Sequence, residues 1–142
     1  GNQEVRIERV RVIRHVVQGE SIVVKTLSPV VAYSTLYKAD GRKYTCYFQP
    51  GEPDYNDLID GNLRRKYVAL YKEEPPEGKV KVISKGSPKL NIVKYKGFII
   101  KGCSGRLLLQ GPEALLQVGI DAGLGSKNSQ GFGCIEIIGR GR

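Results

Sequence analysis

The sequence of 142 residues contains no methionine, only one histidine, and three cysteines without paired spacing. Because Cys46, Cys103 and Cys134 fit neither a disulfide framework nor a zinc site, we expect buried thiols in a cytoplasmic protein without metal or cofactor. No apolar run approaches the roughly 18 residues of a membrane-spanning helix, and no secretory signal opens the chain. These absences predict a soluble globular domain that is long enough to bury a core.

The missing methionine also bears on where the chain begins. Translation starts at methionine, whereas this sequence starts at Gly1 and enters a strand-like pattern without a lead-in. We therefore expect Gly1, together with Asn2, to be a remnant of cloning or processing. The chain is then a fragment of a longer protein.

Negative charge is missing from one long stretch. The net charge is +9, and half of the 14 acidic residues lie between Glu52 and Glu77. From Gly78 to Pro112 there is no acidic residue, and the basic residues there are Lys79, Lys81, Lys85, Lys89, Lys94, Lys96, Lys101 and Arg106. A stretch with one sign of charge indicates a polyanionic partner, nucleic acid above all. A solvated surface is the alternative explanation.

Hydrophobic periodicity predicts an α+β fold. The expected strands are 5–12, 22–27, 34–38, 43–48, 79–84, 91–101, 106–110 and 134–138, with turns at Asp40-Gly41 and around 102–105. One helix is expected from an N-cap at Asp54 to the Pro75-Pro76 pair, and a second from Pro112 to Ala122. Gly61 inside the first helix costs about 1 kcal/mol of helix propensity, which indicates that another segment approaches there. The order is the βαββαβ pattern of a ferredoxin-like antiparallel sheet with two helices, here with an added β-hairpin.

The most specific segment is the glycine-rich loop, which we define as residues 123–133. Gly123-Leu124-Gly125 and Gly131-Phe132-Gly133 bracket five polar residues. Glycines permit positive φ and close backbone approach, so the amides of such a loop can turn toward the oxygens of a ligand. Ser126, Lys127, Asn128 and Ser129 add donors for phosphate and sugar. The loop is therefore expected to grip a sugar-phosphate backbone, with a flexible connection as the alternative.

Common nucleotide-binding motifs do not explain this loop. A dinucleotide fingerprint follows a strand and opens a helix, whereas this loop follows a helix and opens a strand. The spacing of a P-loop, with its terminal Lys-Ser/Thr, is absent as well.

The loop resembles the C-terminal glycine-rich motif of the CRISPR repeat-associated RNA-binding superfamily. More narrowly, the chain resembles the endoribonucleases that cut CRISPR precursor RNA within its repeats. Three further segments carry this resemblance: Lys25–Val30, Asn62–Tyr67 and Leu107–Gly111. Their order and spacing match the second half of that family from Val5 to Ile138.

This resemblance implies two tandem ferredoxin-like domains in the intact protein, of which residues 1–142 are the C-terminal one and the N-terminal one is missing. It implies metal-independent cleavage, in which the 2′-hydroxyl of the RNA attacks the neighbouring phosphate. The usual catalytic histidine of the family lies in the N-terminal domain. No catalytic residue is therefore carried over to this chain.

Among single residues, the basic run on the first helix is the other candidate for phosphate contact. Arg64 and Arg65 lie off the apolar stripe of that helix, where a solvated face explains them equally well. Lys66 lies on the stripe, so its stem either covers the core with the amine reaching solvent or positions the amine for phosphate. The only histidine, His15, is a weak candidate for a general base because no titratable partner is legible beside it.

Other residue groups are more ordinary. Asp54, Asp57 and Asp60 complement the dipole at the start of the helix and are not expected to bind metal. The tyrosines of the hairpin region could stack on bases, although sheet packing explains them as well; they are Tyr33, Tyr37, Tyr44 and Tyr47.

Three functions remain open from sequence. One is a part of a precursor-processing endoribonuclease that binds repeat RNA. Another is a non-catalytic RNA-binding subunit of the same superfamily within a CRISPR effector complex. The third is an unrelated ferredoxin-like module that binds protein or small ligands. A homodimer is possible for the first two. Membrane association is not expected.

Overall fold

The computed structural model describes residues 16–141, and the predicted strand 5–12 lies outside them. The elements, in chain order, are β1 (Ser21–Thr26), β2 (Ala32–Tyr37), β3 (Lys43–Phe48), α2 (Tyr55–Tyr71), β4 (Lys81–Tyr95), β5 (Phe98–Gln110), α3 (Glu113–Ala122), the 3₁₀ turn η1 (Asn128–Gln130) and β6 (Ile135–Arg140). Neither helix is long and apolar enough to cross a membrane.

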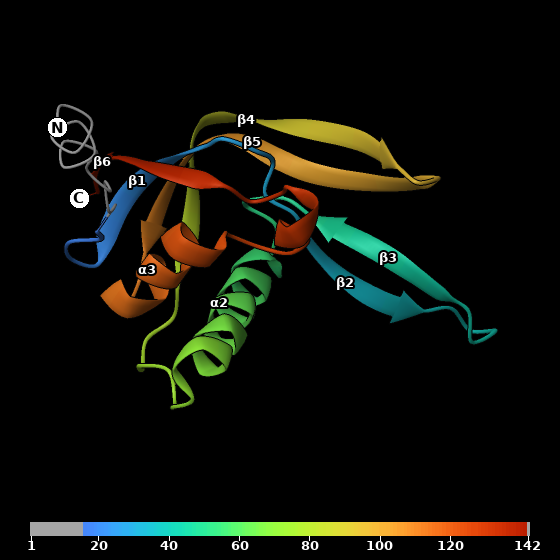
Figure 1. The fold of residues 1–142 in the computed structure, drawn as a ribbon. Coiled ribbons are helices and arrows are strands. Elements are labelled where there is room, and N and C mark those ends of the chain that lie inside the picture. Colours follow the sequence, from blue (N-terminus) through green and yellow to red (C-terminus); the bar gives the residue numbers. More distant parts are fainter. Residues whose placement is uncertain (1–15, 142) are drawn as a thin grey trace, which may run out of the picture.

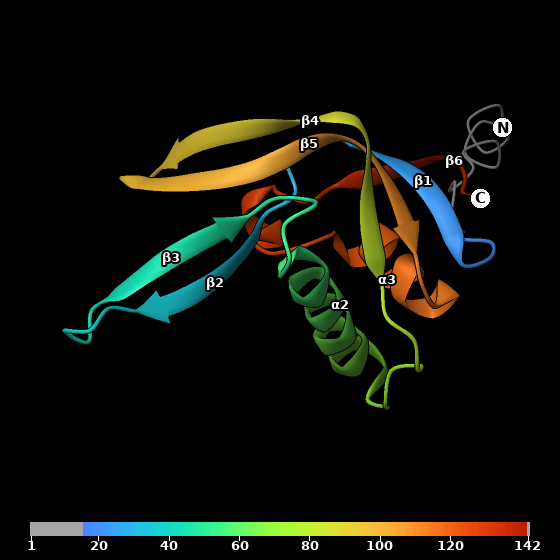
Figure 2. The same cartoon turned by 180° about the vertical axis from the view of Figure 1, so that it is seen from behind.

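Four strands form one antiparallel sheet in the order β4-β5-β1-β6. Strand β1 therefore lies between β5 and β6, and the last strand of the chain lies beside the first described one. Both helices cover the same face of this sheet (Figures 1 and 2). This arrangement is the ferredoxin-like fold, as the sequence predicted.

The core lies between the sheet and the two helices. Helix α2 buries Tyr55, Ile59 and Leu63, which recur at spacings of four residues, so that one stripe faces the sheet. From the sheet, alternate residues such as Ile22 and Val24 point into the same layer.

Two details of helix α2 differ from the sequence prediction. Asp54 occupies the N-cap position, but its side chain makes no capping hydrogen bond. A side chain at Gly61 would meet only a guanidinium nitrogen of Arg65, 3.2 Å away, on the flexible end of a side chain of the same helix. The expected close approach of another segment at Gly61 is therefore wrong.

The longest hairpin was placed incorrectly by sequence. Its turn is at Lys96-Gly97, between the paired residues Tyr95 and Phe98, and both turn residues have positive φ (48° and 81°). Positive φ at both central positions is the signature of a type I′ turn, whose twist matches that of the flanking strands. The predicted turn at 102–105 lies inside β5 instead.

A close approach explains why the glycines of 102–105 misled the prediction. A Cβ atom on Gly102 would lie 2.7 Å from Cβ of Pro29, so this position allows a neighbouring segment to pass the strand. Next to it, Val30 and Cys103 exchange two backbone hydrogen bonds of 2.8 Å. Strand β5 therefore continues through the glycines and pairs with the chain that leads into β2.

The added hairpin β2–β3 forms a sheet of its own. Its turn contains Asp40 and Gly41 as predicted, and the carboxylate of Asp40 accepts a hydrogen bond of 3.0 Å from the backbone N–H of Arg42. The hairpin and the distal part of β4–β5 extend from the same side of the domain and diverge (Figure 1).

Only one of the three thiols is buried. Cys103 is buried, and burial raises the pKa of its thiol to about 11. Cys46 is half-buried and Cys134 is exposed, so the expectation of three buried thiols is wrong for Cys134.

Candidate nucleic-acid interface

The glycine-rich loop is a folded element held by backbone hydrogen bonds, both within the loop and to the segment before β2. It connects α3 to β6 and lies where the two diverging hairpins begin (Figure 1). Leu124 N–H donates to the carbonyl of Gly133 at 2.8 Å, Ser126 N–H to that of Val31 at 2.7 Å, and Gly133 N–H to that of Pro29 at 2.8 Å. These three amides already donate to backbone carbonyls of the protein. Only the remaining part of the loop can therefore bind a ligand with its backbone.

Glycine occupies these positions of the loop for two different structural reasons. A Cβ atom on Gly125 would overlap the carbonyl oxygen of Val31, and one on Gly133 would overlap that of Leu124. At Gly123 it would overlap the side chain of Asn128. These three positions serve close packing of the loop.

Gly131 differs from the other three glycines. A Cβ atom there would have no heavy atom within 4 Å, and the residue has a φ of 94°. It is glycine because of backbone conformation and faces open space.

Lys66 reaches the loop from helix α2. Its amine donates hydrogen bonds of 2.8 Å to the carbonyl oxygens of both Gly123 and Gly125. Partial burial lowers the pKa of this amine to about 8, with repulsion from Arg65 as a smaller cause. From the sequence, the amine of Lys66 was expected either to reach solvent or to contact phosphate. In the structure it is hydrogen-bonded to two carbonyl oxygens of the glycine-rich loop.

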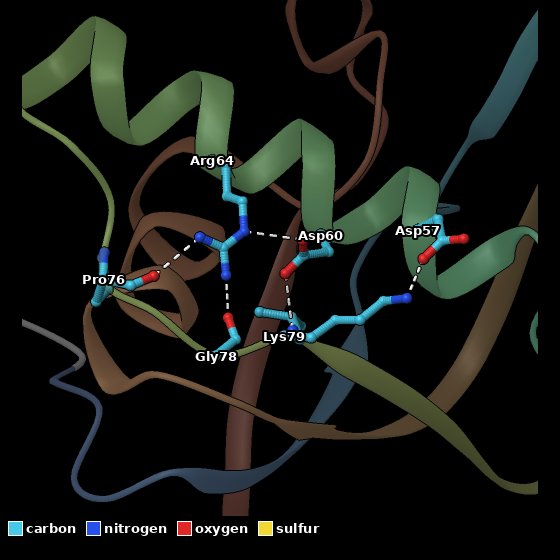
Figure 3. A network of polar contacts seen from close by, with 7 residues as sticks. Asp57, Asp60, Arg64, Pro76, Gly78 and Lys79 are labelled. Atoms are coloured by element: carbon cyan, nitrogen blue, oxygen red, sulfur yellow. Dashed lines mark hydrogen bonds and ion pairs between the residues drawn. The ribbon is translucent and has the colours of Figure 1, made fainter.

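Arg64 is held within the fold, as Figure 3 shows. Its guanidinium donates to the carboxylate of Asp60 and the carbonyl of Pro76, both at 2.8 Å, and to the carbonyl of Gly78. Asp60 also accepts a hydrogen bond of 2.8 Å from the N–H of Val80. The network fastens the connection between α2 and β4, which gives Arg64 a structural role.

Lys79 is also paired within the fold, whereas Arg65 is not placed in this network. The amine of Lys79 pairs with the carboxylate of Asp57 (Figure 3). Arg65 is exposed on the surface of helix α2. No group of three or more potential metal ligands occurs within residues 16–141. His15 lies outside the described residues, so its role as a general base stays a prediction.

The polar part of the loop divides between internal and surface contacts. The side-chain amide of Asn128 donates to the carbonyls of Leu124 at 3.3 Å and Phe132 at 3.0 Å, so it stabilises the loop. Lys127 has a φ of 62°, and its amine lies 5.1 Å from the centre of the Tyr33 ring, a cation–π distance. Ser126 is half-buried, and Ser129 is exposed.

Lys127 and Tyr33 border a cleft of about 860 Å³, a size typical of ligand sites. Residues from both hairpins and the loop line it: Tyr33, Thr35, Thr45, Tyr47, Lys96, Phe98, Ile99, Ile100, Lys101, Lys127 and Gln130. The lining contains basic and aromatic residues and no acidic one.

Of the residues that line the cleft, those of the glycine-rich loop were predicted from the sequence to bind RNA, and the tyrosines were considered as residues that stack on bases. The lining residues from β5 were missed. The signal was the Lys96-Gly97 pair between aromatic residues, which marks a hairpin turn.

The fold and the site define a ferredoxin-like α+β domain with a glycine-rich loop between its second helix and its last strand. Residues 12–137 match the family described as CRISPR associated protein Cas6, C-terminal, and the chain belongs to this family.

Among its relatives is the CRISPR-associated endoribonuclease Cas6 of Pyrococcus furiosus, which is 30% identical over 97% of this chain and 53% of that protein. Two solved structures are similar in fold. One, from a Cas6-related gene of Pyrococcus furiosus, has a TM-score of 0.80 at 20% identity and covers 89% of this chain and 51% of that one. The other, an RAMP protein binding different RNA substrates, has a TM-score of 0.75 at 21% identity over 91% of this chain and 52% of that one. The chain thus spans about half the length of each of these proteins.

Proposed function

We propose that this chain is the RNA-holding C-terminal part of an endoribonuclease that cuts precursor CRISPR RNA within its repeats. The observation that carries the proposal is the meeting of Lys127, Tyr33 and the glycine-rich loop at one basic cleft. Membership of the Cas6 family supports it, because the curated relative is an endoribonuclease. The solved RAMP protein that binds RNA substrates supports the RNA as ligand.

The physical basis is complementarity to a flexible polyanion. Lysines attract phosphates and release their counterions, whereas aromatic side chains stack on the bases of an unstacked strand. Lys96, Lys101 and Lys127 supply the positive charge in the cleft. Tyr33, Tyr47 and Phe98 supply the rings.

The proposed reaction uses the RNA as its own nucleophile. The 2′-oxygen forms a bond to the adjacent phosphorus, the bond from phosphorus to the 5′-oxygen breaks, and a 2′,3′-cyclic phosphate and a 5′-hydroxyl result. A base takes the proton of the 2′-hydroxyl, and an acid protonates the leaving 5′-oxygen. We assign neither role to a residue of this chain. Its part is to bind the strand and fix its position, and the preceding half of the intact protein supplies the chemistry without a metal ion.

RNA-binding measurements test this proposal. The affinity of the chain for a repeat RNA is compared with that of Lys127→Ala and of Lys79→Ala as a matched control. Lys127→Ala is expected to weaken binding several-fold, because Lys127 borders the cleft. Lys79→Ala is expected to leave affinity nearly unchanged, since Lys79 pairs with Asp57 beside helix α2. No detectable RNA binding at low salt would contradict the proposal, and so would equal losses in the two variants.

A further inference from the structure

The two hairpins form a two-walled cleft because they share one fixed point. At Val30 and Cys103, two backbone hydrogen bonds of 2.8 Å join the chain leading into β2 to strand β5. Beyond this point β2 pairs only with β3, and β5 pairs with β4. The two hairpins therefore diverge from a common base (Figures 1 and 2). Residues from both of them line the cleft.

The first wall presents two tyrosines from one face of the β2–β3 hairpin. Tyr33 and Tyr47 are directly opposite each other in the ladder, with ring centroids 6.0 Å apart and a tilt of 53°. Both rings pack at their base against a small buried cluster of Val31, Ile100 and Phe132. The rings are thus fixed in place while remaining only half-buried.

The second wall presents apolar side chains that the fold leaves uncovered. Phe98 follows the turn of the β4–β5 hairpin and is 73% exposed, and its neighbour Ile99 is 52% exposed. Both contribute to the lining of the cleft. Phe98 lies on the same face of β5 as Ile100, which packs with Tyr33 and Tyr47. Large apolar groups gathered at the mouth of a cleft indicate a ligand with an apolar surface.

The charges of the cleft select the chemical class of that ligand. The lining residues include Lys101 and Lys127 and no acidic residue. The amine of Lys127 lies over the Tyr33 ring, so a cation and an aromatic face are presented side by side. A ligand that matches both has a flat π-system joined to an anion. A nucleotide has this composition.

We infer that this cleft binds one unpaired nucleotide of a single-stranded RNA segment. The base stacks among Tyr33, Tyr47 and Phe98, and the phosphate lies at Lys127 and Lys101. A paired base in a duplex is stacked between its neighbours and does not offer its face to a protein ring, so the cleft selects an unstacked strand. This inference rests on the proposed function and deepens it, because it specifies which form of the RNA the chain holds.

The experiment compares one RNA strand with a blunt duplex of the same sequence in binding to the intact chain. Phe98→Ala removes the exposed ring, Phe98→Tyr keeps one, and Tyr44→Ala is the matched control. Tyr44 lies on the same hairpin as Tyr47 and is 42% exposed, but it pairs with Leu36 on the opposite face. A single-strand probe that carries 2-aminopurine reports stacking through quenching of its fluorescence.

Phe98→Ala is expected to weaken binding of the single strand by about 5- to 150-fold, the range for loss of one base–aromatic stack. It should also restore 2-aminopurine fluorescence, whereas Phe98→Tyr and Tyr44→Ala should bind and quench as the unaltered chain does. Duplex binding should be the same in all four proteins.

Unchanged single-strand affinity in Phe98→Ala would overturn this inference while leaving the proposed function intact. An equal loss for strand and duplex would do the same. If Phe98→Ala kept its RNA affinity but lost association with the preceding half of the intact protein, the cleft would be a protein contact. Absence of binding to either form of RNA would contradict both proposals together.

Discussion

The amine of Lys66 lies 2.8 Å from the carbonyl oxygen of Gly125, at a position in the glycine-rich loop where any side chain would overlap Val31. The same amine also binds the carbonyl of Gly123. One lysine of helix α2 thereby fixes the position of the Gly123-Leu124-Gly125 triplet of the loop. The loop geometry depends on a residue more than fifty positions away in the sequence.

Replacement of Lys66 should loosen the loop. Lys66→Met keeps most of the stem and removes the amine, which leaves two partly buried carbonyls without a donor. Hydrogen bonds from charged donors contribute about 1.5–3 kcal/mol, so we expect a loss of unfolding free energy of that order, together with weaker RNA binding. Urea denaturation and RNA titration of the same samples measure both effects. Arg65→Met, a change at the exposed neighbour, should stay within about 0.5 kcal/mol. Equal stability of the two variants would contradict an anchoring role for Lys66.

The lowered pKa of Lys66 predicts a dependence of stability on pH. Its pKa is about 8 in the folded chain and 10.5 for an unperturbed lysine, so the unfolded chain binds more protons between these values. Stability therefore rises with pH in that window, relative to a chain that lacks the amine. We expect the difference in unfolding free energy between the unaltered chain and Lys66→Met to grow from pH 8 toward pH 10. Parallel pH profiles of the two proteins would contradict this.

The glycines of the loop should respond differently to substitution. Gly125→Ala forces a contact with the backbone of Val31, so we expect a marked drop in Tm and a loss of RNA binding that follows from unfolding. Gly131→Asn has open space, and asparagine tolerates positive φ, so the fold should survive with a cost of about 1 kcal/mol. Any loss of RNA affinity in folded Gly131→Asn then reports on approach of the ligand. Unchanged affinity would leave Gly131 a purely conformational position.

Salt should weaken RNA binding steeply if phosphates are the main contacts. The logarithm of affinity is expected to fall with the logarithm of salt concentration at about 0.7 per phosphate contact for a single strand. Lys101→Ala and Lys127→Ala should each reduce the slope by about one contact, because both lysines border the cleft. A titration series at increasing potassium chloride measures the slope. An affinity that is independent of salt would remove the charge argument.

The chain alone should not cut RNA efficiently. Incubation with a matching repeat RNA in EDTA is expected to give little 2′,3′-cyclic phosphate product, since we assign no catalytic residue to this part of the protein. Addition of the preceding half of the intact protein should restore cleavage at one position. Robust cleavage by the chain alone, abolished by His15→Ala, would make His15 the general base. Binding without cleavage after addition of the preceding half would favour the non-catalytic RNA-binding subunit.

Local signals in the sequence were sufficient for the fold class. Alternating strands, the apolar stripe of α2 and the Asp40-Gly41 turn are determined by neighbouring residues, and the order of the elements then restricts the sheet topology. The glycine-rich loop was also legible, because two Gly-apolar-Gly triplets at fixed spacing are a local pattern.

Only the tertiary structure decided what the individual residues do. Gly102 looked like a turn residue, but it lies inside β5, where the absence of a side chain allows Pro29 to pass close to it. Lys66 looked like a surface or phosphate-binding lysine, but helix packing places its amine against the loop carbonyls. The cleft combines the β2–β3 hairpin, the turn of β4–β5 and the loop, which are far apart in the chain. Periodicity and spacing describe a segment and its neighbours. Which distant segments share a surface depends on tertiary packing, and this packing involves side chains from all parts of the chain.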